Sequence, residues 1–270
     1  MTINTVKYWH RLSGALMITI LFSWSMVNPV QAKDGFKITS GWDFSSGEYD
    51  QDIVTHDTTT YSWPLSISYR TGSWRIKGSI PYTVIKGPEY ELQDDGAGGT
   101  VEQEVVKTQR GFGDLWLTVT HELDINLTAG VAVDLSAKLK LPLADRDKGL
   151  GTGRADGVLQ MDFFHRLDRD WYLLGGVGYK WKGSSPTYDP RNVWLGSLGT
   201  QYLLDRKNSL GLILDYQQAT SDTSADIKEI MGLVSHRWNK TWSGSFYMVH
   251  GLTESTPDLG GGFQLSYRFQ

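Results

Sequence analysis

Cysteine is absent from all 270 residues of the chain, which excludes disulfide bonds and thiolate metal sites. Beyond residue 32 the sequence also lacks any apolar run of about 18 residues, the length that a membrane-spanning helix requires. A basic excess is missing as well. Residues 1–32 hold two of the 26 basic residues and none of the 30 acidic ones, which leaves 24 against 30 and a net charge of about −6. This mild acidity argues against a nucleic-acid partner, which would favour a basic face.

The first 32 residues have the pattern of a secretion signal. Lys7 and Arg11 give a basic start, Ala15 to Val27 is an apolar run, and Val30-Gln31-Ala32 offers the small residues of a signal peptidase site. We therefore expect residues 1–32 to be a cleaved signal peptide. The alternative, an N-terminal membrane helix, is disfavoured because the apolar run is short.

The strongest positive signal is an apolar side chain at every second position. Phe263, Leu265 and Tyr267 alternate with other residues near the C-terminus, and residues 127–141 alternate without a break. A period of two means that one face of a strand meets an apolar medium and the other a polar one. About twelve such segments follow one another, and single-chain outer-membrane barrels require an even number. We therefore predict that residues 33–270 form an all-β fold, a single transmembrane antiparallel meander β-barrel of about 12 strands in the bacterial outer membrane. A soluble β-sandwich is the alternative.

The connections between the predicted strands alternate between short and long. The short ones are residues 70–73, 123–127, 167–170, 205–208 and 238–240. Short periplasmic turns and long outer loops are the rule in outer-membrane barrels, which places both termini in the periplasm. The longest connection, Gly87 to Gln109, is expected to be a loop that constricts or covers the outer mouth. Aromatic residues gather at both ends of the strands, as in interfacial girdles.

One predicted strand is less regular than the others. Between Ile227 and Trp238 the parity of the apolar residues changes near Ile230-Met231. An extra residue in one strand of a pair would shift the parity in this way, so we expect a β-bulge there.

The polar face of the predicted strands lines the lumen, and its charges fall into groups. Barrel closure is expected to bring five basic residues together towards the periplasmic end: Lys37, Arg70, Arg75, Lys77 and Arg268. Acidic residues are expected on the next part of the wall: Asp114, Glu122, Asp134, Asp156 and Asp162. Three lysines are expected nearer the outer loops: Lys138, Lys140 and Lys180.

These lumenal charges predict a solute pathway. Opposed charges across a narrow, low-dielectric opening focus a field and select solutes by charge, so the ten residues of the basic and acidic groups are predicted to steer a small solute. The alternative is a lumen filled by satisfied ion pairs, which a barrel of this size permits. Small lumenal residues such as Gly176 and Gly178 leave space and favour the pore.

Signals for an enzyme are weak. Some outer-membrane barrels are hydrolases with a Ser-His pair near the lipid, and His250 has the parity to face lipid, with Ser255 following it. No motif joins a serine or a carboxylate to this histidine, so a histidine of the girdle region is the favoured interpretation. Residues 148–153 look like a phosphate loop but lack Gly-Lys-Ser/Thr and a following helix. We expect no catalytic residue, no cofactor and no bound metal.

Three sequence blocks resemble a known family. They are Gly111-Phe112-Gly113-Asp114-Leu115, then Leu139-Lys140-Leu141-Pro142, then Gly149 to Asp156. They are similar to the outer-membrane family named for the meta pathway of phenol degradation, with its Gly-Gly-Asp-Leu strand start, Leu-Pro-x-Gly-Asp strand end and Gly-Thr-Gly loop. The resemblance covers about residues 110–269. It departs from the family pattern at Ala144-Asp145, where Gly-Asp is usual.

The resemblance implies a transporter, with aromatic or hydrophobic compounds as proposed solutes, and it assigns no substrate residue. We therefore expect an outer-membrane channel or transporter for passive uptake of a small solute. Its expected partners are outer-membrane lipid, the small-molecule solute and the barrel-assembly machinery. A closed barrel that acts structurally or through its extracellular loops is the alternative, and a barrel hydrolase is the third.

Overall fold

The structure of the protein, a computed structural model, describes residues 34–51, 54–94, 100–123, 130–184 and 189–269. The predicted signal peptide, residues 1–32, lies outside the described residues, and so does most of the short turn predicted at residues 123–127. In the part that is described, no helix is long and apolar enough to cross a membrane.

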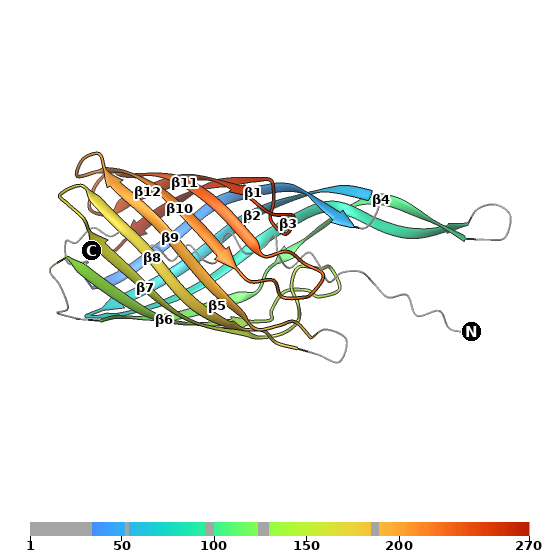
Figure 1. The fold of residues 1–270 in the computed structure, drawn as a ribbon, viewed down its shortest axis with the longest axis horizontal. Helices are drawn as coiled ribbons and strands as arrows, with labels where there is room; N and C mark the ends of the chain where they lie inside the picture. Colours follow the sequence, from blue (N-terminus) through green and yellow to red (C-terminus); the bar gives the residue numbers. More distant parts are fainter. Residues whose placement is uncertain (1–33, 52–53, 95–99, 124–129, 185–188, 270) are drawn as a thin grey trace.

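The described chain is built from antiparallel strands (Figure 1). Their bounds are β1 Gly35–Gln51, β2 Val54–Thr71, β3 Trp74–Asp94, β4 Thr100–Phe112, β5 Leu115–Leu123, β6 Val131–Leu141, β7 Asp156–Arg166, β8 Trp171–Trp181, β9 Val193–Leu203, β10 Asn208–Gln217, β11 Ile227–Arg237, β12 Trp242–Gly251 and β13 Leu259–Arg268.

The strands close into one barrel. Apart from β4 and β5, which both pair with β3, each strand pairs with its neighbour in the chain, and β1 pairs with β13 to complete the ring. Strand β3 pairs with β5 along one part of its length and with β4 along the rest, so β4 and β5 together occupy a single position in the wall. The barrel therefore has 12 strand positions, which confirms the predicted fold class. We call the end with the short connections the turn end and the opposite end the loop end.

The junction between β4 and β5 is a β-bulge. Phe112 pairs with Tyr82 and Trp116 pairs with Ser79. Between these two pairs, residues 113–115 lie opposite only residues 80–81 of β3. Gly113 and Asp114 are adjacent and both buried, as expected where a bulge turns two successive residues to the same side. A Cβ atom at Gly113 would lie 2.8 Å from Cγ of Pro81, so the bulge needs glycine at this position.

The prediction of a β-bulge near Ile230-Met231 was wrong. Strand β11 pairs residue by residue with both β10 and β12, without an extra residue on either side. The parity changes because apolar side chains of these strands also face the lumen, where they form a cluster: Ile213, Met231, Leu233, Tyr247 and Val249.

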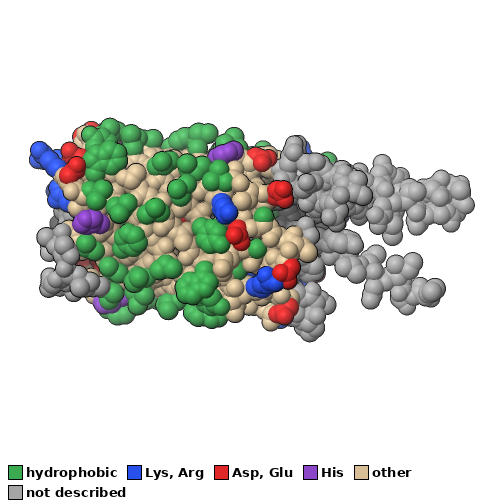
Figure 2. Space-filling view, in the orientation of Figure 1, with side chains coloured by type: hydrophobic (Ala, Val, Ile, Leu, Met, Phe, Trp, Pro, Cys, Tyr) green, Lys and Arg blue, Asp and Glu red, His purple; other side chains and the backbone are tan. Residues whose placement is uncertain are grey.

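Apolar side chains cover the outside of the barrel. On β6, Leu135 and Leu139 are exposed, whereas Ser136 and Lys138 point to the other face and are buried. Figure 2 shows the result, a band of hydrophobic side chains on the visible wall with charged side chains mostly towards its two ends. An outward apolar band of this kind is the surface with which an outer-membrane barrel meets lipid.

Aromatic pairs lie across neighbouring strands at both ends of this band. At the turn end the pairs are Phe36–Tyr69, Trp171–Tyr202 and Trp242–Tyr267, with ring centroids 4.6, 4.8 and 4.9 Å apart. Towards the loop end Tyr179 and Trp194 are directly opposite each other, at 5.0 Å. The positions agree with the predicted interfacial girdles.

Three connections at the turn end share one hydrogen-bonding arrangement. In each, Oδ1 of an Asp or Asn accepts hydrogen bonds from the backbone N–H groups two and three residues later, at 2.5 to 2.9 Å. The accepting residues are Asp168, Asp205 and Asn239. Such Asx turns fix a tight reversal without glycine. At Asp205 the hydrogen bond from the Asn208 side chain is the largest cause of a lowered carboxyl pKa.

The longest predicted loop is not a loop. Over the range Gly87 to Gln109, β3 and β4 continue to pair from Gly87–Lys107 to Asp94–Thr100. Figure 1 shows this hairpin running beyond the loop end as a continuation of the wall, away from the lumen. The prediction that the segment constricts or covers the mouth is therefore corrected. Glycine and charged residues suggested an irregular loop, but continuous cross-strand pairing extends the sheet instead.

The Asx turns predict a stability effect. Asn239→Ala removes the acceptor of two backbone N–H groups, so the free energy of unfolding should fall by about 1 kcal/mol. Asn239→Asp should retain the turn, because Asp168 and Asp205 fill the same role in the neighbouring connections. Urea unfolding of the barrel refolded in phospholipid vesicles would measure both. An unchanged unfolding midpoint for Asn239→Ala would contradict this account.

Candidate functional site

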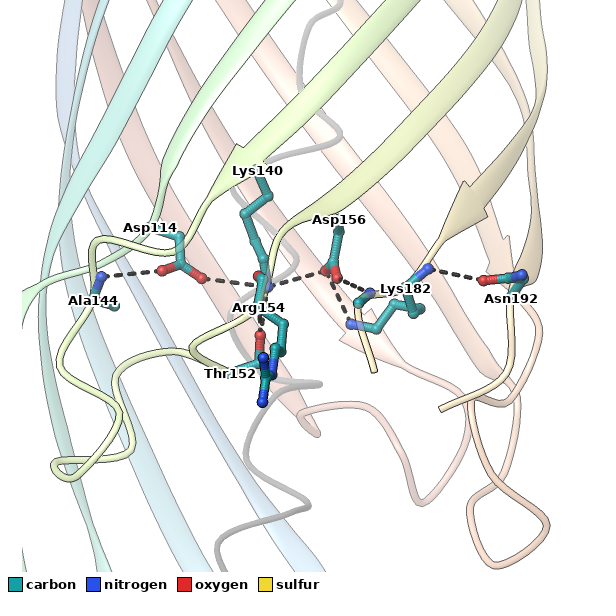
Figure 3. A network of polar contacts seen from close by, with 9 residues as sticks. Asp114, Lys140, Ala144, Thr152, Arg154, Asp156, Lys182 and Asn192 are labelled. Carbon is teal, nitrogen blue, oxygen red and sulfur yellow. Dashed lines mark hydrogen bonds and ion pairs between the residues drawn. The ribbon is translucent and has the colours of Figure 1, made fainter. Parts of the chain in front are cut away.

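Four charged residues form a buried network near the loop end of the lumen (Figure 3). Nζ of Lys140 lies 3.0 Å from Oδ2 of Asp156 and 3.4 Å from Oδ2 of Asp114. Nζ of Lys182 lies 3.1 Å from the same oxygen of Asp156, whose Oδ1 accepts a hydrogen bond from the Gly183 N–H at 3.0 Å. We call Asp114, Lys140, Asp156 and Lys182 the loop-end clasp.

The clasp holds the β6–β7 connection, residues 142–155, against the barrel. Oδ1 of Asp114 accepts a hydrogen bond from the Ala144 N–H at 3.1 Å, and Nζ of Lys140 donates to Oγ1 of Thr152 at 2.8 Å. Both bonds join a strand of the wall to a residue of the connection. The connection is therefore fixed at the loop end by charge-assisted hydrogen bonds.

The three sequence blocks that carry the family resemblance meet in this clasp. The β-bulge turns Asp114 into the lumen, Lys140 comes from the second block, and Asp156 ends the third. Packing is close here, because a Cβ atom at Gly151 would lie 2.6 Å from Cβ of Ala144 and 2.9 Å from Oδ1 of Asp114. The family pattern thus specifies a structural junction of the barrel.

The turn end holds a second group of ion pairs. Arg70 forms an ion pair with Glu122. Arg75 contacts two acids, with Nη2 3.1 Å from Oδ2 of Asp134 and Nη1 3.9 Å from Oε1 of Glu122. These two arginines therefore have their charge compensated by acidic residues of β5 and β6, so the expected cluster of five basic residues is divided.

The other three basic residues of that cluster lie together. Lys37 and Arg268 are directly opposite each other on β1 and β13, and Ser68 of β2 lies between Lys37 and Lys77. Over the described ranges, none of these three side chains forms an ion pair with a carboxylate. Barrel closure thus brings three cations together without an acidic partner.

The middle of the lumen links opposite charges through a neutral amide. Nζ of Lys138 donates to Oε1 of Gln160 at 2.7 Å, and Nε2 of Gln160 donates to Oδ1 of Asp162 at 2.6 Å. Further towards the loop end, Nζ of Lys180 lies 5.9 Å from the centroid of the Trp116 ring, within range of a cation–π contact.

Several lumenal residues were missed from the sequence. The hydroxyl of Tyr247 donates to Oδ1 of Asp43 at 2.6 Å inside the barrel, and Asp215 and Glu229 face each other on β10 and β11. Strand parity could have identified Asp43 and Asp215, whereas Glu229 lies on the strand whose parity was misread. Lys182 follows the end of β8, where alternation stops, and no signal in the sequence points to it.

Apolar residues also face the lumen, which the predicted polar lining did not include. Near the loop end they are Trp116, Val158, Val193 and Leu195. Near the turn end they are Phe164, Tyr172, Leu174 and Leu203. The lumen is therefore an amphipathic surface, in which charged rows and apolar patches alternate.

The histidine that suggested a hydrolase has a structural contact. Nδ1 of His250 donates to the backbone carbonyl oxygen of Asp258 at 2.7 Å, and the side chain is exposed on the outer face of β12. His121 stacks on Trp74 at 4.3 Å between centroids, as expected in an aromatic girdle. Among the residues that the structure places, no group of three or more His, Asp or Glu could hold a metal ion.

The loop-end clasp predicts that one substitution within it strongly lowers the stability of the barrel. Asp156→Asn leaves Lys140 and Lys182 buried without their shared carboxylate, so the free energy of unfolding should fall by about 3–5 kcal/mol. Asp222→Asn is the matched control, because Asp222 pairs with Arg191 at the surface with 82% of its side chain exposed, against 2% for Asp156. Its expected cost is about 0–1 kcal/mol. Urea unfolding would compare the two, and equal losses would refute the structural role of the clasp.

The fold is similar to those of solved outer-membrane barrels. The COG4313 outer membrane channel from Pseudomonas putida F1 has a TM-score of 0.66 and 16% identity, and the match covers 90% of this chain and 100% of that one. The KdgM porin has a TM-score of 0.56 and 9% identity, covering 87% and 99%. The toluene transporter TbuX from Ralstonia pickettii has a TM-score of 0.50 and 11% identity, covering 88% and 90%. At these identities the likeness establishes the outer-membrane barrel fold.

Comparison of sequences identifies the family to which the chain belongs. No curated protein shows a significant match to the chain. The family model described as "Putative MetA-pathway of phenol degradation" matches residues 80–269, a span that includes all three blocks of the resemblance and most of the barrel. By this match the chain belongs to the phenol-degradation MetA-pathway family.

Proposed function

We propose that the protein is an outer-membrane channel through which a small solute diffuses passively, without catalysis and without a cofactor. The observation that carries the proposal is the inward face of the barrel, which carries polar and charged side chains, beside its apolar patches, from the turn end to the loop end. A barrel that served only as an anchor would need no such lining. The solved neighbours, which are channels and transporters rather than enzymes, support this assignment.

The solute that we propose is an aromatic or hydrophobic compound. The family description names phenol degradation, and one structural neighbour is a toluene transporter. In this chain the apolar lumenal cluster around Trp116 and Val193 offers a surface that such a solute would contact. The ten predicted steering residues, in particular Lys37, Lys77 and Asp162, would set the charge of the lumen around it.

We further propose how the barrel is placed in the membrane. The short connections and both ends of the described chain, at Asp34 and Phe269, lie at the turn end, which we assign to the periplasm because outer-membrane barrels keep their turns there. Residues 1–32 would be removed as a signal peptide on export. The barrel-assembly machinery would then insert the chain, with lipid against the outward apolar face.

Single-channel recording tests whether the lumen is open. The purified, refolded protein in a planar bilayer should give stable, discrete current steps. Ser197→Trp, which adds a bulky ring to a lumen-facing position of β9, should lower the step size to roughly half or less, because a barrel of this size has little spare width. Gly232→Trp is the control, since Gly232 faces outward into open space. A correctly folded barrel that carries no current would refute the channel.

The second candidate function is a surface interaction, which the β3–β4 hairpin favours because it extends beyond the barrel. Replacing residues 90–104 by Asn-Gly joins the paired residues Glu89 and Val105 through a two-residue turn. Since the hairpin continues the wall rather than crossing the mouth, we expect unchanged conductance. A clear rise in conductance would show that the hairpin obstructs the pore, and an unchanged channel that no longer attaches to cell surfaces would favour the second function.

A further inference from the structure

The strand register places five basic side chains in one continuous row on the lumen wall. Its members, in order of the strands from β13 through β1 to β8, are Arg268, Lys37, Lys77, Lys138 and Lys180. From β1 onward an uncharged residue stands on the strand between consecutive lysines, so neighbours are roughly 10 Å apart. Because the strands are tilted, the row climbs from the turn end to the loop end. We call it the cationic row.

The three cations at the turn end of the cationic row repel one another. This repulsion destabilises the fold, and the needs of folding do not account for it. Like charges directly opposite each other on paired strands are destabilising, and Lys37 and Arg268 form such a pair, with Lys77 two strands away. Within the described chain these three cations have no acidic partner, although eight acidic side chains face the same lumen at Asp43, Asp114, Glu122, Asp134, Asp156, Asp162, Asp215 and Glu229. An arrangement of this kind is suited to an anion that comes from outside.

The acidic side chains follow a row of their own. Glu122, Asp134, Asp162, Asp215 and Glu229 are connected through the register from β5 to β11. On β6 the two rows are four residues apart, at Lys138 and Asp134, or about 13 Å, with neutral Ser136 between them. The two rows are thus separated across the wall on β6, whereas towards the loop end Asp156 of the clasp lies close enough to Lys180 to compensate part of its charge.

Apolar side chains interrupt the loop-end half of the cationic row. Val158 lies between Lys138 and Lys180, and Val193 is the next residue of the row after Lys180. Both belong to the cluster that contains Trp116, over whose ring Lys180 lies. A ligand held here by an ammonium group would therefore contact aliphatic and aromatic carbon at the same time.

We propose that the cationic row is the binding track for an organic anion that combines a carboxylate with an apolar body, such as an aromatic acid. The carboxylate moves between successive cations of the row, while the apolar body rests on the Trp116 cluster in the loop-end half. This proposal rests on the proposed channel function and narrows its solute from aromatic or hydrophobic compounds to amphipathic anions. The row's length, from one end of the barrel to the other, makes it a path rather than a single site.

Equilibrium binding tests the track without requiring an open pore. Calorimetry of the refolded protein in detergent at low salt, where screening is weak, would use benzoate as the probe. Two further ligands serve for comparison. Benzyl alcohol has the aromatic ring of benzoate without its charge, and acetate has its carboxylate without the apolar body. We expect benzoate to bind at least about tenfold more tightly than either. The double variant Lys138→Gln/Lys180→Gln removes the two ammonium groups beside the Trp116 cluster and should lose at least about tenfold in benzoate affinity. Asp162→Asn/Asp215→Asn is the matched control on the acidic row and should bind benzoate as tightly or more tightly.

The possible results distinguish failure of the proposed binding track from failure of the proposed channel function. Neutralising Lys138 and Lys180 removes two like charges of the row, so the variant should fold, and the single variant Lys138→Met provides a second test if it does not. Equal binding of benzoate and benzyl alcohol, or an unchanged affinity in the lysine variants, would overturn the track even if the protein conducts. Lysine-dependent benzoate binding by a barrel without current would support the track and refute the channel. In a conducting barrel, the anion-to-cation permeability ratio should fall in the lysine variant and rise in the acidic-row variant.

Discussion

Closure of the hydrogen-bonded ring is the constraint on which the rest of this molecule depends. In hydrocarbon no water is available to backbone N–H and C=O groups, so a strand that enters the membrane needs a partner on both sides. The pairing of β1 with β13 supplies the last of these partners. Once the ring is closed, the register of every pair is fixed relative to all others, and a shift by one residue would turn a whole strand inside out. The outward apolar band and the inward polar lining are therefore consequences of one choice of register.

The loop-end clasp shows how a local irregularity serves this global order. A regular strand would point either Gly113 or Asp114 into the lumen, whereas the bulge points both, so that the Asp114 carboxylate reaches Lys140 and the Ala144 N–H. Lys140 in turn contacts Asp156, the first residue of β7. The bulge and the clasp thus connect three successive strands and the segment between two of them. This explains in physical terms why the sequence blocks that carry the family resemblance contain glycine, aspartate and lysine.

Much of this architecture could be predicted from the sequence, because a period of two is a local signal. The alternation in β6 and β13 predicted the barrel, and the short connections predicted the turn end. Signals that depend on partners distant in the sequence could not be read in the same way. The hairpin of β3 and β4 depends on pairing across the range Gly87 to Gln109, and the contact of Met231 with Tyr247 depends on where β12 lies. The lumenal charges were found by parity, but which cation meets which acid depends on the stagger between strands, and only the closed ring determines that.

The charges of the lumen are used in two physically different ways, and the register decides between them. Where opposite charges are brought within contact, as for Arg75 with Asp134 and Lys140 with Asp156, each compensates the burial of the other and the wall becomes rigid. Where the register aligns like charges, as for Lys37 with Arg268, no such compensation is available and a potential remains in the lumen. A lumen filled only with satisfied pairs would hold no such potential, and one lined only with like charges would oppose folding. Because the paired groups stand at both ends of the barrel, they can support the wall on which the unpaired cations are carried. In the channel that we propose, the stability of the barrel and the selectivity of its lumen would thus depend on different residues of the same inward face.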